Sequence, residues 1–385
     1  MTSKAEAVII GGGVHGCSIA YHLAKMGWKN VVLLEKRYLA GGATGRSAAG
    51  IRHQFGTEIN IHLAAESVKR MERLEEELDY PESIELMQGG YLMLAYSRDQ
   101  LDQFKCNMEL QKKLHPHNKT VILSPQEIKE MIPLINLEGL MGASFNPRDG
   151  HANPFHVNQA FANAASRLGV HIRTAREVVD INTQGDRVTG VTLNNGEQIS
   201  SPVVVNAAGA HGKLLGRMVG LDIPVIPERH QILVTEPLEM FLYTMVISLT
   251  HGAYFKQTPH GSMLLGVGDP ENEVKDFNER SSWQFLQDVA KKVTFHMPAL
   301  KNVNIIRQWA GLYDITPDSQ AILGDTEVKG FYLDLGWSGH GFQLAPVVGQ
   351  IMAEIISGKK PVIDVGCMHL RRFEEGNLIP EPACV

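Results

Sequence analysis

The chain has 385 residues, of which 44% are hydrophobic and 20% charged, and this balance excludes a largely disordered protein. The formal net charge of −6 excludes a general nucleic-acid binder, which needs excess Lys and Arg to neutralise phosphates. Four cysteines without a C-x-x-C pair, no histidine spacing typical of a metal site and no apolar run of bilayer length indicate a reduced, soluble, cytoplasmic protein without metal or disulfide framework.

The first elements along the chain predict a βαβ unit. Residues 7–10 are a short apolar run typical of a buried strand. Residues 16–26 have helical spacing and stop at Gly27, and residues 31–34 form a second buried strand. A parallel strand pair joined by a helix is therefore expected at the start of the chain.

The rest of the chain mixes helices and strands. Ser124 and Glu127 predict a helix start with a capping box, and Asn194-Asn195-Gly196 predicts a hairpin turn. Further helices are expected over residues 58–78, 158–169 and 281–295, and from the turn after residue 335 to residue 356. Strands are expected over residues 90–95, near 171, 178 and 188, and over 201–206, 231–236, 254–257, 262–267 and 331–335. The stretch 222–310 changes character without a linker or repeat, so interleaved domains are expected.

A glycine motif joins the first strand to the first helix. Gly11-Gly12-Gly13-Val14-His15-Gly16 carries G-x-G-x-x-G, and Glu35 ends the second strand 19 residues after Gly16. Gly11 allows a tight turn, Gly13 a close approach to a pyrophosphate and Gly16 close helix–strand packing, while Glu35 can accept ribose hydroxyls. This predicts a dinucleotide site, and the motif fits FAD and NAD alike. The predicted binding residues here are Gly11, Gly13, Val14, His15, Gly16, Glu35 and Lys36.

Two further glycine-rich segments favour FAD. The small-residue loop 41–50 can lie along an extended ligand with Arg46 and Ser47 near phosphates, although an ordinary surface loop is the alternative. Residues 336–343 lead from a strand into a helix, whose positive N-terminal end suits the negative charge of a reduced flavin. An ordinary strand–helix turn explains these residues equally well.

Together these segments resemble a known family, the glycine/D-amino-acid oxidase-like (DAO) FAD-dependent oxidoreductases. Within it the chain is similar to the sarcosine oxidase β-subunit and to proline and opine dehydrogenase β-subunits. The resemblance spans nearly the whole chain and rests on Gly11–Gly16 with Glu35, Thr44–Arg52, Asp149-Gly150 with Pro154, Val205–Ala210, Gly311–Asp318 and Gly339–Phe342.

The resemblance implies an α/β fold in which a discontinuous Rossmann-like FAD-binding domain carries an α+β substrate domain on an antiparallel sheet. We expect residues 1–88, 146–221 and 311–385 in the FAD-binding domain, and residues 89–145 and 222–310 in the substrate-binding domain. The FAD-contacting residues that the resemblance adds are Thr44, Gly45, Arg46, Ser47, Ala49, Gly50, Ile51, Val178, Val179, Ala208, Gly209, Gly311, Gly339, His340, Gly341, Phe342 and Gln343.

Three departures from the family pattern shape the expected cofactor chemistry. Gly311 stands where monomeric sarcosine oxidases carry the flavin-linking Cys, so FAD is expected to be non-covalent. Some β-subunits carry FMN on a His near segment 150–156, where this chain has His151 and His156, so a second flavin is compatible with a hetero-oligomer. The stretch 263–266 offers no oxygen-activating Lys, which favours a dehydrogenase over a fast oxidase.

The reaction implied by the resemblance is oxidation of a C–N bond in a small secondary or N-methyl amino acid of the sarcosine, dimethylglycine, proline or opine type. Arg52 is the first candidate for binding the substrate carboxylate, with pairing to a phosphate or a local Glu as the alternative. Lys256 is the second candidate, or else a solvated lysine. Tyr254 either closes the pocket or only packs, and His53 and His340 are proton carriers or structural groups.

Two rival functions stay open. One is a 2-hydroxy-acid dehydrogenase of the same fold. The other is a β-subunit that needs α-type or γ-type partner chains to pass electrons. No nucleic-acid partner and no membrane span are expected in either case.

Overall fold

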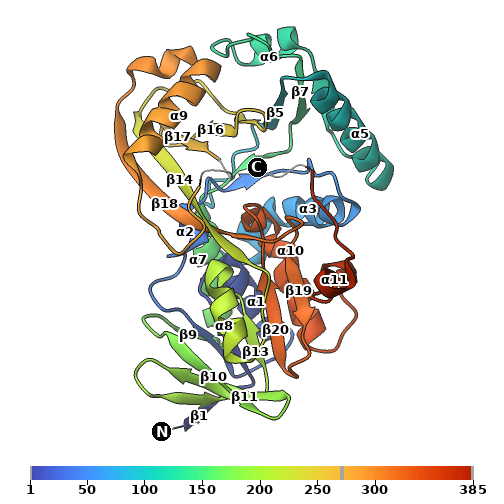
Figure 1. Ribbon diagram of the computed structural model, residues 1–385, viewed down its shortest axis with the longest axis vertical. Coiled ribbons are helices and arrows are strands. Elements are labelled where there is room, and N and C mark those ends of the chain that lie inside the picture. The colour runs from blue at the N-terminus through green and yellow to red at the C-terminus, as the bar shows by residue number, and fades with distance from the viewer. Residues whose placement is uncertain (1, 269–272, 383–385) are drawn as a thin grey trace.

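Two β-sheets of different kinds occupy the two halves of the molecule along its long axis (Figure 1). The structure, a computed structural model, describes residues 2–268 and 273–382. The half that contains the N-terminus is built around a mainly parallel sheet, and the other half around a larger, mainly antiparallel sheet. Within the described residues, no helix combines the length and apolar character that a membrane span requires.

The parallel sheet has six strands in the order β19-β20-β13-β2-β3-β9, and its edge pair β19-β20 is antiparallel. Its central strands are apolar and buried on both faces, which is typical of strands between two covering layers. The strands are β2 (Ala7–Ile10), β3 (Val31–Leu34), β9 (His171–Arg173), β13 (Val204–Asn206), β19 (Ile322–Asp325) and β20 (Phe331–Leu335).

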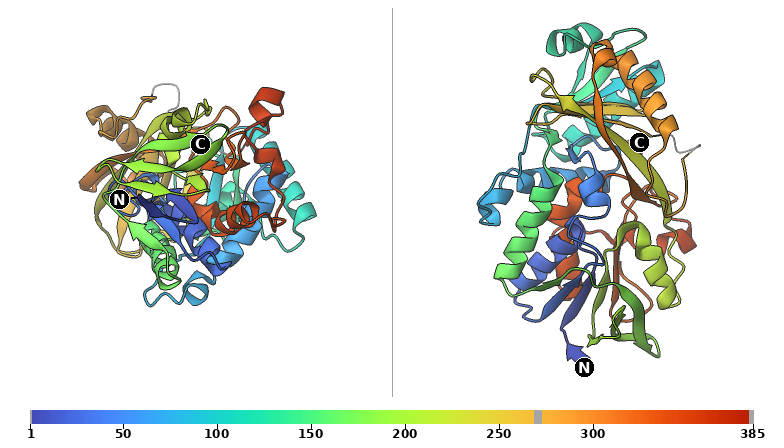
Figure 2. Two further views of the ribbon diagram at one scale, coloured as in Figure 1. Left: turned by 90° about the horizontal axis from the view of Figure 1, so that it is seen from below. Right: turned by 90° about the vertical axis from the view of Figure 1, so that its left-hand side faces the viewer.

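Helices cover one face of this sheet, and a small second sheet with one helix covers the other (Figure 2). The helical layer contains α1 (Val14–Lys25), α3 (Glu58–Met71), α7 (Pro154–Arg167) and α10 (Gly341–Ile356). The opposite layer contains β1 (Thr2–Lys4), β10 (Val178–Gln184), β11 (Arg187–Leu193), β12 (Gln198–Ser200), the 3-10 turn η1 (Gly209–His211) and α8 (Gly212–Met218).

The larger sheet has eight strands in the order β18-β14-β17-β16-β15-β5-β7-β6, and its described strands pair antiparallel except β15 with β5. Helices α9 and α6 pack on its outer face, and its inner face faces the other half. The elements are β5 (Tyr91–Ala95), β6 (Val121–Leu123), α6 (Pro125–Met131), β7 (Gly142–Asn146), β14 (Ile226–Pro237), β15 (Met245–Ser248), β16 (Ala253–Gln257), β17 (Ser262–Val267), α9 (Trp283–His296) and β18 (Ile305–Ile315).

Short elements complete the chain. A two-stranded ribbon joins the halves near the middle of the molecule. These elements are α2 (Ala43–Arg46), β4 (Gly50–Ile51), α4 (Leu74–Glu77), α5 (Arg98–Leu114), β8 (Gly150–His151), η2 (Pro298–Asn302), η3 (Gly366–Met368) and α11 (Arg372–Glu375).

The expected fold class is confirmed, as are the N-terminal βαβ unit, the capping box at Ser124 and the hairpin turn at Gly196. Strand β18 runs through the expected domain boundary between residues 310 and 311, and the division of the chain into domains stays a proposal. Cys17, Cys106 and Cys367 are free thiols, and Cys384 lies outside the described residues.

Three helices differ from the expectation. The helix expected over residues 58–78 is interrupted at Arg73, whose φ of −121° is not helical, and so divides into α3 and α4. Helix α7 begins earlier than expected because Asn153 accepts the backbone N–H groups of residues 155 and 156. Helix α5 was not predicted because its buried face is Phe104, Asn107 and Gln111, which is not an apolar repeat.

Candidate active site

A long cleft of about 260 Å³ runs past the N-terminus of α1, where the glycine motif lies. Gly11 has φ +119°, and a Cβ on it would lie 2.3 Å from the carbonyl oxygen of Ala207. A Cβ on Gly16 would lie 1.9 Å from the carbonyl oxygen of Gly11. Both positions therefore require glycine, the first for its backbone conformation and both for close approach.

Glu35 is held rigidly at the end of β3. Its two carboxylate oxygens accept the backbone N–H groups of Gly12 and Arg37, each at 2.8 Å. The cleft is lined by Glu35 and by the start of α1, which has Gly13 as its N-cap residue and no acidic residue in its first turn. Thr44, also in the lining, accepts the backbone N–H of Val14 at 3.1 Å. This arrangement suits a ribose at Glu35 and a pyrophosphate at the positive end of α1.

A buried cluster ties the glycine motif to the turn after β20. His15 Nδ1 lies 3.0 Å from Asp334 Oδ2, and His15 Nε2 lies 3.0 Å from the carbonyl oxygen of Gly341. Trp337 donates its indole N–H to Asp334 at 2.7 Å and stacks on the His15 ring. Burial disfavours the His15 cation, but the charge and hydrogen bond of Asp334 outweigh burial and raise the His15 pKa.

Asp314 lies beside this cluster and accepts the backbone N–H of Gly336 at 2.8 Å. Burial raises the Asp314 pKa to about 6, although backbone hydrogen bonds and His15 oppose this. Because folding raises the pKa of Asp314, ionisation of this carboxyl group lowers the free energy of unfolding as the pH rises from about 4 to about 6.

We therefore expect Asp314→Asn to remove that loss of stability. Asn keeps an oxygen that accepts the Gly336 N–H, so the free energy of unfolding at pH 7 should rise by up to about 3 kcal/mol. Urea unfolding between pH 4 and pH 7 measures the difference between variant and parent, with the exposed Asp222→Asn as control. A constant difference across this pH range would contradict the assignment.

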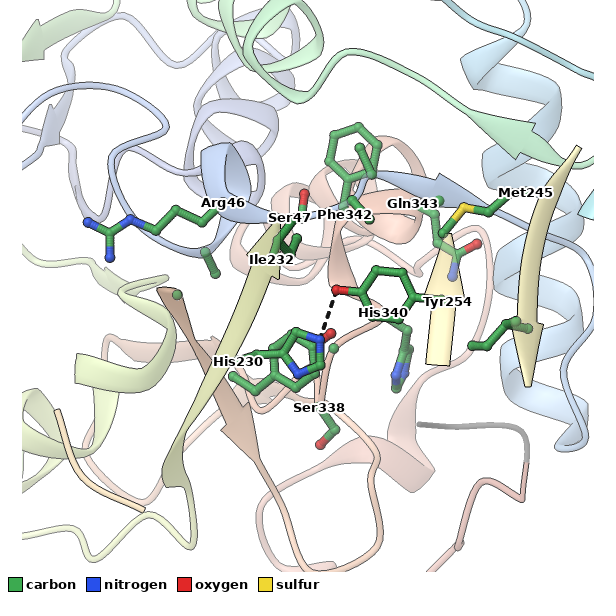
Figure 3. Close-up of a pocket in the computed structure, with 18 of the residues that line it drawn as sticks. Arg46, Ser47, His230, Ile232, Met245, Tyr254, Ser338, His340, Phe342 and Gln343 are labelled. Carbon is green, nitrogen blue, oxygen red and sulfur yellow. Dashed lines mark hydrogen bonds between the residues drawn. The ribbon is translucent and has the colours of Figure 1, made fainter. Parts of the chain in front are cut away.

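A second, inner cavity of about 100 Å³ lies between the two halves. It shares Ser47, Tyr313, Gly339 and Phe342 with the long cleft, so the two spaces adjoin. Figure 3 shows how side chains from the larger sheet and from the start of α10 converge on it. A ligand that fills the cleft can thus present one end to a molecule in the inner cavity.

The wall from the larger sheet is aromatic and uncharged. The Tyr254 hydroxyl lies 2.9 Å from His230 Nε2, and the His230 ring stacks on Tyr313 with 4.3 Å between ring centroids. Burial lowers the His230 pKa to about 4 and raises the Tyr254 pKa well above its usual value. Both side chains are therefore neutral at pH 7.

The opposite wall contains Arg52 above a buried carboxylate network. The Arg52 guanidinium donates to the carbonyl oxygen of Gln54 at 2.6 Å and lies 4.1 Å from the Phe55 ring centroid. Glu381, from the chain after α11, accepts from Gly56, Thr57 and Asn60 in the same region. Arg52 thus provides a cation at the inner cavity, with an anion nearby.

A comparison with known families shows to which family the chain belongs. The family model described as DAO, FAD-dependent oxidoreductase, matches residues 6–355. The chain belongs to the DAO family of FAD-dependent oxidoreductases. The glycine turn, the fixed Glu35 and the adjoining cavities are compatible with an extended dinucleotide such as FAD.

Similar proteins agree with this assignment. Sarcosine oxidase subunit beta of an Arthrobacter species is 32% identical, over 98% of this chain and 93% of that protein. The crystal structure of L-proline dehydrogenase from P. horikoshii is 37% identical with a TM-score of 0.91, over 98% of this chain and all of that chain. Rat mitochondrial dimethylglycine dehydrogenase is 30% identical over 94% of this chain, but the match spans only 44% of that enzyme.

Most of the predicted residues line the two cavities. The long cleft is lined by Gly11, Gly13, Val14, His15, Glu35, Lys36, Thr44, Ser47, Val178, Ala208, Gly209, Gly339, Gly341 and Phe342. The inner cavity is lined by Arg46, Ser47, Ala49, Gly50, Arg52, Tyr254, Gly311, Gly339, His340, Phe342 and Gln343. Their roles toward FAD and substrate remain proposals.

Six predicted residues lie outside both cavities, namely Gly16, Gly45, Ile51, His53, Val179 and Lys256. The two glycines serve close packing, Gly16 against Gly11 and Gly45 against Ala40. Ile51 is buried on the far side of its strand from Gly50, and Val179 is 46% exposed on β10.

His53 and Lys256 are buried for different reasons. The backbone N–H and Nδ1 of His53 both lie within hydrogen-bond distance of Asp149 Oδ1, so its ring is committed to a buried carboxylate. Lys256 is 4% exposed, opposite Leu264 in the neighbouring strand β17, and burial lowers its pKa to about 7. It is not the solvated lysine considered as an alternative.

Arg46 turns away from the inner cavity (Figure 3). Its guanidinium pairs with Glu279 at 2.7 Å and donates to the carbonyl oxygen of Ala310 at 3.0 Å. Glu279 also pairs with Arg37 at 2.9 Å and lines the long cleft. An acidic side chain from the half with the larger sheet therefore bridges two arginines beside the cleft.

The sequence did not point to His230, Tyr313, Glu279 or Glu381 as individual site residues. Tyr313 lies in a segment that carried the resemblance, which was its available signal. The other three lie on strands or loops without a motif, and only the tertiary fold brings them to the site.

Proposed function

We propose that this protein oxidises the C–N bond of a small secondary or N-methyl amino acid to an imine. When bound, FAD supplies the acceptor for the hydride equivalent. The observation that carries the proposal is the inner cavity, where the cation of Arg52 faces neutral aromatic walls beside the start of α10. The names of the similar proteins, sarcosine oxidase subunit beta and L-proline dehydrogenase, support the same substrate class.

The charged and the neutral side chains of the inner cavity have different roles in the proposed reaction. Arg52 binds the substrate carboxylate through its guanidinium, which can donate two parallel hydrogen bonds. The neutral His230 and Tyr254 leave the amine end without a counter-charge, which favours the unprotonated amine that this oxidation requires. His340, whose pKa burial lowers to about 4, is likewise neutral at pH 7.

FAD is proposed to be non-covalent, because Gly311 provides no thiol for a linkage. The protein is proposed to be a dehydrogenase, since residues 263–266 of β17 include no Lys. The relatives named subunit beta support a complex in which a partner chain receives the electrons. Within such a hetero-oligomer an FMN is proposed as a second cofactor near segment 150–156, where His151 is buried and Nδ1 of His156 lies 2.8 Å from the Tyr80 hydroxyl.

Anaerobic bleaching of the flavin tests the reaction. The purified holoenzyme is mixed with sarcosine, dimethylglycine, proline, an opine, D-amino acids and 2-hydroxy acids, and the flavin absorbance is followed. We expect bleaching by N-alkyl amino acids or proline and none by hydroxy acids. Bleaching by hydroxy acids alone would favour the rival dehydrogenase, and no bleaching by any compound would contradict the proposal.

The same samples test the acceptor and the linkage. After oxygen is admitted, reoxidation should be slow, and acid precipitation should release FAD into the supernatant. Fast reoxidation would contradict the dehydrogenase, and flavin retained on the denatured chain would contradict the non-covalent cofactor.

A further inference from the structure

The hydrogen bond between Tyr254 and His230 gives the inner cavity a polar group of defined direction (Figure 3). Tyr254 comes from β16 and His230 from β14, and both line the cavity while being only 5% and 8% exposed. The His230 ring is held in turn by stacking on Tyr313, with 9° between the ring planes.

The direction of this hydrogen bond follows from the acidity of the two groups. Both side chains are neutral at pH 7 because burial disfavours both charged forms. A phenol is a stronger acid than a neutral imidazole N–H, and an imidazole nitrogen is the stronger acceptor, so the Tyr254 hydroxyl donates to His230 Nε2. The hydroxyl proton of Tyr254 then lies in the hydrogen bond to His230. The Tyr254 oxygen can therefore only accept a hydrogen bond from a ligand.

Two glycines fix the rings that make this pair. A Cβ on Gly266 would lie 2.2 Å from the Tyr254 hydroxyl oxygen, so the ring lies directly over this backbone. A Cβ on Gly339 would lie 2.7 Å from Tyr313 Cε2, so Tyr313 is pressed against the turn before α10. The acceptor oxygen therefore has little freedom to turn away from the cavity.

We propose that Tyr254, held as an acceptor by His230, selects amino acids whose nitrogen keeps an N–H. This rests on the proposed oxidation of a C–N bond in the same cavity. The N–H of a neutral secondary amine donates to the Tyr254 oxygen, whereas a tertiary amine has no N–H and leaves this oxygen without a donor. The favoured substrate class is thus the secondary amino acid, and His230 is a positioning residue that acts through Tyr254.

Matched substrate pairs test the selection. Stopped-flow reduction of the holoenzyme flavin is measured without oxygen for sarcosine against N,N-dimethylglycine and for proline against N-methylproline. The wild-type rate constant divided by Kd should favour the secondary amine in each pair. In Tyr254→Phe this preference should fall about tenfold, the effect of losing one buried hydrogen bond.

His230→Phe keeps a ring against Tyr313 but removes the acceptor for the hydroxyl proton. Its preference should fall in the same direction, and the double variant should show no further fall beyond Tyr254→Phe, because the two side chains act as one unit. Tyr96→Phe is the matched control: the Tyr96 hydroxyl also lies 2.9 Å from a histidine nitrogen, Nδ1 of His296, but Tyr96 lines neither cavity. That variant should keep the wild-type ratio.

The outcomes separate this inference from the proposed function. If amines bleach the wild-type flavin but Tyr254→Phe keeps the wild-type ratio, or if the wild type prefers the tertiary amine, the inference is overturned and the proposed function stands. If no amine bleaches the wild-type flavin, the proposed function fails and the inference fails with it.

Discussion

Gly11→Ala should yield a protein that no longer retains FAD. The added methyl group would lie 2.3 Å from the carbonyl oxygen of Ala207, and φ is +119°. The backbone of residues 207–208, which lines the cleft, must then move. We expect the Kd for FAD to rise at least about tenfold, which corresponds to a loss of 1.4 kcal/mol in binding, and the ratio of flavin to protein after purification to fall. Flavin absorbance and titration of the apoprotein with FAD measure it.

Gly27→Ala is the matched control for this loss. Gly27 also has a positive φ, +99°, but no heavy atom lies within 4 Å of its added Cβ. It should cost about 1–2 kcal/mol of stability through backbone strain alone and keep full FAD content. Circular dichroism verifies that both variants are folded. A Gly11→Ala protein that stays stoichiometrically yellow would refute the assigned cleft.

Glu381→Ala should be the most destabilising of the side-chain replacements proposed here. The Glu381 carboxylate is buried and accepts from the backbone of Gly56 and from the side chains of Thr57 and Asn60, with Arg52 close enough to lower its pKa. Removing it leaves these buried donors without their acceptor and takes a negative charge away from the buried Arg52. We expect a loss of about 3–5 kcal/mol in the free energy of unfolding at pH 7, measured by denaturant titration.

The pH dependence of this loss provides a second readout. Burial raises the Glu381 pKa, but the hydrogen bonds and Arg52 outweigh burial and hold the pKa below the usual value of 4.5. Its stabilising effect is therefore present above pH 4.5 and declines as the pH falls through the lowered pKa. The difference between Glu381→Ala and parent should shrink in acid. The exposed Glu375→Ala should change stability by less than about 0.5 kcal/mol, and an equal effect of both variants would disprove the network.

The sequence was informative where structure is set locally. The strands around the glycine motif are short apolar runs, and Gly16 is required by the carbonyl oxygen of Gly11 in the same βαβ unit. The same holds for the capping box at Ser124, which depends on residues three apart. For the turn at Gly339 the positive end of the following helix suited a reduced flavin, but an ordinary turn explained the residues equally well, and only the resemblance favoured the flavin.

The remaining site residues depend on contacts that spacing does not encode. The sequence left His53 as a proton carrier or a structural group, and its hydrogen-bond partner Asp149 lies 96 residues away in the chain. Lys256 lies in β16, where all five residues are buried, and a lysine in a strand gives no indication of such burial from its charge. Glu381 reaches Thr57 across 324 residues, and no periodic pattern links the two segments.

The His15–Asp334 contact also has a consequence for biosynthesis. The two residues are 319 positions apart, and β2 lies between β3 and β13, with β20 beyond. At translation rates of roughly 5–20 residues per second, the ribosome needs about 15–60 s after His15 before Asp334 is made. The nascent glycine loop must wait through that interval without its later partner, so the coenzyme can be captured firmly only after most of the polypeptide has been synthesised.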